Sequence, residues 1–173
     1  GPGLKADSTD WNTNYRYVFV HGLSGWGSYD AVNKIMPYWG MFGGDLMKYL
    51  RKQGFDAHGA SVAGTASAWD RACELYAQLT GTTVDYGEAH AKAHNHDRYG
   101  RTFYQPLVKD WGELDKNGKI EQVHLIGHSY GGATVRMLVH LLTEGSAEER
   151  AVTPSDKISG LFTGGKSDWV KST

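Results

Sequence analysis

One strand–turn–helix unit constrains the fold of this chain more than any other part of its sequence. Residues 123–126 form a short apolar run, Gly-His-Ser-Tyr-Gly follows at 127–131, and apolar residues then recur at helical spacing as far as Gly145. A serine held between glycines at a sharp turn from strand to helix is typical of a nucleophile elbow, which exposes the serine hydroxyl. The glycines are needed because a Cβ at either position would collide with the adjoining strand or helix. The alternative interpretation is a glycine-rich turn that serves only packing.

The rest of the chain also alternates between strand and helix signals. The elements predicted besides this unit are strands at 15–20, at 55–62 and from 169 onward, helices at 45–53, 67–79 and 106–111, a turn at 116–119, and a short helix with an ordered loop at 82–104. Such alternation predicts an α/β fold with a mostly parallel sheet and helices on both faces.

Size and composition fit one domain. The chain has 173 residues, with 18 Lys and Arg against 19 Asp and Glu, and this balance argues against a nucleic-acid-binding protein, which would carry a basic patch. No apolar run approaches the ~20 residues that cross a bilayer, so we expect no transmembrane segment. The single cysteine, Cys73, is expected to be a small buried residue. Residues 148–150, Glu-Glu-Arg, are expected to be a solvated helix end or loop.

The boundaries follow from the same patterns. We interpret residues 1–14 as a polar N-terminal extension that begins with the remnant of a cleaved expression tag, Gly-Pro-Gly at 1–3. Residues 15–173 then form the N-terminal part of one domain, because the strand that begins near residue 169 is cut short.

An elbow also needs donors for the oxyanion and a general base. In this architecture a loop after an early strand donates one backbone N–H and the residue after the nucleophile donates the other. With Ser129 as the nucleophile, the donors are predicted to be the N–H groups of Leu23 and Tyr130. The only histidine after Ser129 is His140, expected to be half-buried on the same helix and about 16 Å further along its axis. We therefore expect the base and its orienting acid to lie outside these 173 residues.

Several motifs resemble the secreted bacterial lipases of the thermophilic Bacillus and staphylococcal type. They are, in order, VHGLSGWG at 20–27, YWG at 38–40, WDRACELYAQL at 69–79, VDYGEAH at 84–90, YGRT at 99–102 and GHSYGG at 127–132. The resemblance covers nearly the whole chain from about residue 17. It implies an α/β-hydrolase fold, hydrolysis of lipid or other carboxylic esters through an acyl-serine intermediate, and secretion. It also implies calcium in the full-length protein, at a site that is not in this chain.

The resemblance further implies a structural zinc ion bound by two aspartates and two histidines. By motif position the ligands in this chain would be Asp70, His90 and His96, with the second aspartate beyond residue 173, and residues 82–104 would be a zinc-binding insertion. His94 is the alternative ligand, and a His-rich polar loop can also be merely solvated. Two other functions stay open: a carboxylesterase or polyester hydrolase of the same fold, and a catalytically incomplete, zinc-holding fragment with a structural role.

Overall fold

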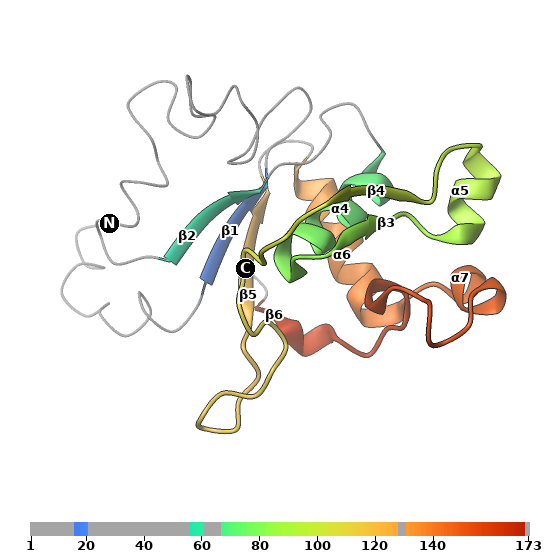
Figure 1. The fold of residues 1–173 in the computed structure, drawn as a ribbon. Coiled ribbons are helices and arrows are strands. Elements are labelled where there is room, and N and C mark those ends of the chain that lie inside the picture. The colour runs from blue at the N-terminus through green and yellow to red at the C-terminus, as the bar shows by residue number, and fades with distance from the viewer. Residues whose placement is uncertain (1–15, 21–55, 61–66, 128–130, 172–173) are drawn as a thin grey trace, which may run out of the picture.

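The computed structural model describes residues 16–20, 56–60, 67–127 and 131–171 (Figure 1). Four strands form one sheet in the order β2-β1-β5-β6, and all three neighbouring pairs are parallel. The strands are β1 (Arg16–Val20), β2 (Asp56–Ala60), β5 (Val123–Gly127) and β6 (Val170–Lys171). The predicted strands all lie in this sheet, and the prediction of a mixed α/β fold with a parallel sheet is confirmed.

Two long helices pack next to the sheet. Helix α4 (Ala68–Thr80) contacts α6 (Gly131–Glu144), which in turn contacts β1 and β5 (Figure 1). As predicted, Ser67 caps α4: its Oγ accepts the backbone N–H of Asp70 at 3.2 Å, and Gly81 ends the helix in the left-handed conformation. The helix predicted at 45–53 lies outside the described residues, so helices on both faces of the sheet stay a prediction.

Apolar side chains from both layers meet in one core. Val18 and Val20 of β1, Leu75 of α4 and Leu138 of α6 are fully buried there. Cys73 belongs to the same cluster, as the sequence predicted. Among the described strands β1 and β5 are the inner ones, because each pairs with a neighbouring strand on both edges.

The insertion at 82–104 is more regular than predicted. Strands β3 (Thr83–Asp85) and β4 (Tyr99–Thr102) pair in antiparallel fashion, and helix α5 (Glu88–His94) lies between them in the chain. The predicted short helix is confirmed, whereas the rest is a strand pair and not a loop. Every residue of β4 is exposed, so it carries no alternation of polar and apolar side chains that would reveal a strand.

The helix predicted at 106–111 is wrong, because this segment is a series of bends and turns. The backbone N–H groups of Leu107 and Val108 donate to carbonyls at the end of α4 instead of to their own segment. Asp110 has φ of 61°, which a right-handed helix does not allow. The predicted turn at 116–119 is confirmed, and Asp115 Oδ1 accepts the N–H groups of Asn117 and Lys119 there.

The segment from α6 to β6 holds a short helix, α7 (Ala147–Val152), and two single turns, η3 (Gly160–Phe162) and η4 (Ser167–Trp169). Helix α7 lies beside α5 of the insertion (Figure 1). Among the described residues no helix has both the length and the apolar character needed to cross a membrane.

Candidate functional site

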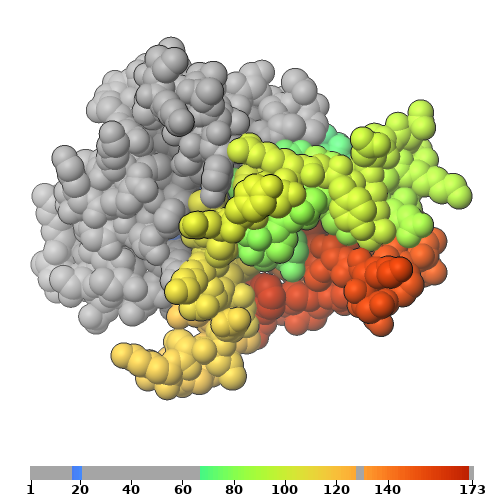
Figure 2. All heavy atoms as spheres, viewed as in Figure 1, coloured from blue at the N-terminus to red at the C-terminus, as the bar shows by residue number. Residues whose placement is uncertain are grey.

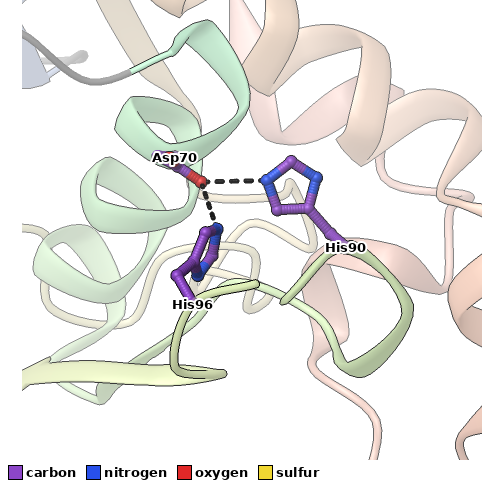
Figure 3. Close-up of side chains that lie close together, drawn as sticks. All are labelled: Asp70, His90 and His96. Atoms are coloured by element: carbon purple, nitrogen blue, oxygen red, sulfur yellow. Dashed lines mark hydrogen bonds and ion pairs between the residues drawn. The ribbon is translucent and has the colours of Figure 1, made fainter. Parts of the chain in front are cut away.

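The three predicted metal ligands in this chain converge at one point between α4 and the insertion (Figure 3). Asp70 comes from the first turn of α4, His90 from α5, and His96 from the chain just after α5. Asp70 Oδ1 is 3.1 Å from His90 Nε2 and 3.8 Å from His96 Nε2. One donor atom from each of the three residues lies within 4.8 Å of the other two, and this is the only such group among the described residues.

A turn at the end of α5 brings the two histidines to the same side. Asn95 follows the helix in the left-handed conformation, with φ of 53°, and asparagine tolerates this conformation better than most residues. The backbone N–H of His96 then donates to the carbonyl of Ala91, which turns the chain back over the helix end. His96 therefore returns toward His90, six residues earlier.

Each of the two imidazole rings has a further contact that orients it. His90 stacks on Trp69 with 4.8 Å between ring centroids, and the Trp69 indole N–H donates to the carbonyl of Tyr86 at 2.8 Å. His96 Nδ1 is 2.8 Å from the carbonyl oxygen of Asp97. Because a carbonyl oxygen only accepts, Nδ1 carries a hydrogen, and in the neutral ring Nε2 then has the lone pair that binds a metal ion.

This donor set suits a zinc ion. Four zinc ligands at about 2.0–2.1 Å in a tetrahedron lie about 3.3 Å apart, which is close to both distances from Asp70. The 3.8 Å between His96 Nε2 and Asp70 Oδ1 is too long for a hydrogen bond, and a cation between the two atoms would bind both. Burial lowers the pKa of His90 although the neighbouring Asp70 raises it, so the ring favours the neutral form that binds metals.

His94, the alternative ligand, does not share in this group. Its ring packs against His90 with 4.3 Å between centroids, but its donor atoms do not join those of Asp70, His90 and His96. The ligand set that follows from motif position is thus the set that the structure brings together.

Strands β1 and β5 end side by side where the nucleophile turn was predicted. Strand β5 ends at Gly127 and α6 begins at Gly131, so only three residues join them. A Cβ on Gly127 would lie 2.4 Å from the carbonyl oxygen of Gly131, which shows how closely the helix start returns to the strand end. Val20, the last residue of β1, is opposite Gly127 in the parallel register, so both strands end at the same edge of the sheet. The predicted nucleophile and oxyanion donors, Ser129, Tyr130 and Leu23, lie outside the described residues.

The structure describes one histidine before this turn, His124, and one after it, His140. His124 lies within β5 and stacks on Tyr17 with 4.8 Å between centroids. His140 lies in the second half of α6 and is exposed, so the expectation that it is half-buried is wrong. The error arises because His140 follows Val139 on a helix whose buried stripe is narrow, and it falls just outside that stripe.

Comparison with known proteins settles the family. The family described as "Lipase-like, C-terminal domain" matches residues 13–173. The chain belongs to this lipase-like family.

Its relatives are bacterial lipases. The lipase-like chain is 42% identical over 171 residues to Lipase 2 of Staphylococcus aureus, which is 98% of this chain and 24% of that protein. Among solved structures, Lipase 1 from Pelosinus fermentans shares 49% identity at a TM-score of 0.83, over 91% of this chain and 40% of that one. Staphylococcus hyicus lipase shares 39% identity at a TM-score of 0.80, over 93% and 41%. The resemblance to staphylococcal lipases is confirmed, and the chain spans about a quarter of the curated relatives it matches.

A buried glutamate, Glu149, lies beside the candidate metal centre, although the sequence predicted that it is solvated. Glu149 of α7 was expected to be solvated, but it is 1% exposed. Its Oε1 accepts the N–H of Ala89 and its Oε2 accepts the N–H of His90, both at 2.8 Å. Gly87 precedes α5 and offers no capping side chain, so these two N–H groups are capped by Glu149 of another segment, which no local pattern in the sequence indicates.

An ion pair between Arg98 and Asp85 joins the two ends of the segment that contains α5. Arg98 donates to both carboxylate oxygens of Asp85, at 3.0 and 3.1 Å, and the N–H of Gly87 donates to Asp85 Oδ1. Arg98 also donates to the carbonyl of Lys157 in the segment after α7. The insertion is therefore held to its neighbours by polar contacts on both sides of the candidate metal centre.

Proposed function

We propose that this chain is part of a secreted serine ester hydrolase, a triacylglycerol lipase with the α/β-hydrolase fold. Ser129 is the nucleophile, and the N–H groups of Leu23 and Tyr130 form the oxyanion hole. The observation that carries the proposal is the close approach of Gly131 to Gly127 at the carboxyl end of an inner strand. A glycine-bounded turn of three residues between such a strand and a helix is the setting in which an elbow presents its nucleophile.

The chemistry follows from these roles. The Ser129 oxygen bonds to the ester carbonyl carbon while its proton passes to a general base, and negative charge gathers on the carbonyl oxygen. The two N–H groups donate to that oxygen, and each is worth about 3–4 kcal/mol in the transition state. The intermediate then breaks its bond to the alcohol oxygen, which takes the proton from the base. Water cleaves the remaining acyl-serine by the same steps and releases the acid.

The base comes from another part of the protein in this proposal. His140 lies nine residues after Gly131, the first residue of α6, which is about 14 Å along the helix axis. His124 lies inside β5, before the turn. The proposal therefore assigns neither histidine as the general base. A calcium site elsewhere in the protein and secretion rest on the family resemblance and stay predictions.

The candidate metal centre has a structural role in the same proposal. A zinc ion bound by Asp70, His90 and His96 would link α4 to the insertion through its three ligands. Asp70 provides the anionic oxygen from the first turn of α4, while the two histidines provide neutral nitrogens from either end of the turn at Asn95. The three side chains thereby fasten residues 82–104 to the core and take no part in ester cleavage.

Labelling with a fluorophosphonate tests the nucleophile. In the protein expressed at its full natural length, we expect one covalent adduct, mapped by peptide mass analysis to Ser129 and absent from Ser129→Ala. An adduct on another serine, or an active protein that is not labelled, contradicts the proposal. A protein that binds zinc but shows neither labelling nor ester cleavage would point to the structural role instead.

Substrate class is tested separately with p-nitrophenyl esters of increasing chain length. A lipase prefers long acyl chains and gains activity at the surface of an emulsion. Preference for short soluble esters would identify a carboxylesterase of the same fold, without changing the role of Ser129.

A further inference from the structure

The carboxylate of Glu149 does not cap α7, the helix to which this residue belongs. Helix α7 begins after Ser146, whose Oγ accepts the N–H of Glu149 at 3.3 Å. Ser-Ala-Glu-Glu at 146–149 has the spacing of a capping box, in which the glutamate side chain normally accepts the N–H of the serine. Here the N–H of Ser146 donates to the carbonyl of Phe162 at 3.0 Å instead. The Glu149 carboxylate is therefore left to bind elsewhere.

It binds the first turn of the neighbouring helix. Two successive N–H groups of α5, those of Ala89 and His90, each donate to one oxygen of Glu149 at 2.8 Å. The residue before α5 is Gly87, which has no side chain to accept them. Helices α5 and α7 lie side by side in Figure 1, and their segments touch at the surface in Figure 2. Glu149 thus caps a helix that is about 60 residues away in the chain.

Only a glycine fits at position 87 beside the Glu149 carboxylate. Its φ of 93° is a conformation that side chains rarely adopt, and a Cβ there would lie 2.3 Å from Glu149 Oε2. The absence of a Cβ therefore permits the buried carboxylate to approach the backbone of α5. The two residues therefore fit each other, whereas a solvated glutamate would need no glycine at position 87.

We propose that Glu149 is a positioning residue for the candidate metal centre. One of its two bonds is to the backbone N–H of His90, the residue whose Nε2 faces Asp70. Helix α5 has seven residues, which is too short to be stable without outside contacts. By holding the first turn of α5, Glu149 sets the position of the His90 ring and raises the affinity of the centre for zinc. This inference rests on the zinc site proposed above.

The test compares two matched variants of the full-length protein. Glu149→Gln puts an amide N–H₂ against one of the two N–H donors, while Glu148→Gln removes the same charge from the exposed neighbouring residue. Zinc affinity is measured by competition with a chromophoric chelator under conditions where both variants are folded. We expect the affinity of Glu149→Gln to fall by about 10-fold or more, as for other residues that orient metal ligands, and that of Glu148→Gln to stay within twofold of the wild type.

Hydrogen exchange in the metal-free proteins gives a second measurement. We expect the backbone N–H groups of Ala89 and His90 to exchange faster in Glu149→Gln than in the wild type or in Glu148→Gln. If Glu149→Gln does not fold, Gly87→Ala displaces the same carboxylate from the other side and should show the same loss of zinc affinity.

The outcomes separate the two proposals. A wild type that binds zinc, with Glu149→Gln binding it equally tightly, overturns the positioning role and leaves the zinc site standing. A merely structural role would lower the stability of Glu149→Gln without changing the zinc affinity of its folded molecules. A wild type that binds no zinc overturns the metal centre itself, and the positioning role with it.

Discussion

Gly127 offers the sharpest test of the turn between β5 and α6. In Gly127→Ala the new Cβ would lie 2.4 Å from the carbonyl oxygen of Gly131 and 2.6 Å from the backbone nitrogen of Gly132. Ordinary contact begins near 3.4 Å, so the strand end and the helix start must separate by about 1 Å. Both groups in the collision are backbone atoms, and no side chain can rotate away to relieve it.

The expected cost follows from that displacement. Overpacking at a rigid contact costs about 1–3 kcal/mol, and for a protein of this size each kcal/mol lowers the melting temperature by about 2–4 °C. A nucleophile moved by about 1 Å loses about 100-fold in rate. We therefore expect Gly127→Ala to lower the free energy of unfolding in urea by about 1–3 kcal/mol and the rate of ester cleavage by about 100-fold.

Gly132→Ala is the matched control. A Cβ at Gly132 meets no atom within 4 Å, and alanine stabilises a helix by up to about 1 kcal/mol relative to glycine. This variant should be as stable as the wild type or more so. If Gly127→Ala and Gly132→Ala unfold at the same urea concentration, the turn is not as tight as the backbone geometry requires and the argument for an elbow fails.

Three further predictions concern the insertion, the core and the sheet. His96→Ala should remove most of the bound zinc measured by metal analysis, and a chelator should lower the melting temperature of the wild type but not of this variant. Burial, and then the nearby Asp70, raise the pKa of the Cys73 thiol, so iodoacetamide at pH 8 should leave Cys73 intact in the folded protein and alkylate it in urea; rapid alkylation without urea would contradict its burial. Burial, and then Lys171, lower the pKa of His124, so below about pH 6.5 the unfolded chain binds a proton that the folded one resists. The free energy of unfolding should therefore fall as the pH decreases from 6.5, and by less in His124→Gln; an unchanged pH dependence in that variant would refute this cause.

The elements that the sequence predicts well are those whose own residues decide their structure. The helix predicted at 67–79 is α4 at Ala68–Thr80, because Ser67 caps it, its apolar face repeats at helical spacing, and Gly81 ends it. The strand before the serine turn is equally clear, since its buried residues alternate within an apolar run. In both cases the signal and the structure lie in the same stretch of chain.

The failures come from contacts that are distant in sequence. Leu107 and Val108 are in the segment predicted to be helical, yet their N–H groups donate to carbonyls at the end of α4. Strand β4 is short and wholly exposed, so its pairing with β3 leaves no pattern in the sequence. Local periodicity cannot reveal an element whose partner supplies the hydrogen bonds.

In the candidate metal centre, the ligands can be predicted from the sequence, whereas the contacts that orient them cannot. The cluster of His90, His94 and His96 in the sequence is compatible with a metal site, and the family resemblance selects His90 and His96 from it and adds Asp70. What holds α5 in place has no such signal, because Glu149 occupies a position that normally caps its own helix. Only the bond from Ser146 to Phe162, seen in the structure, explains why that carboxylate is available to α5. The ligands of a metal site are thus easier to predict from a sequence than the residues that orient them, since orientation depends on how separate segments pack.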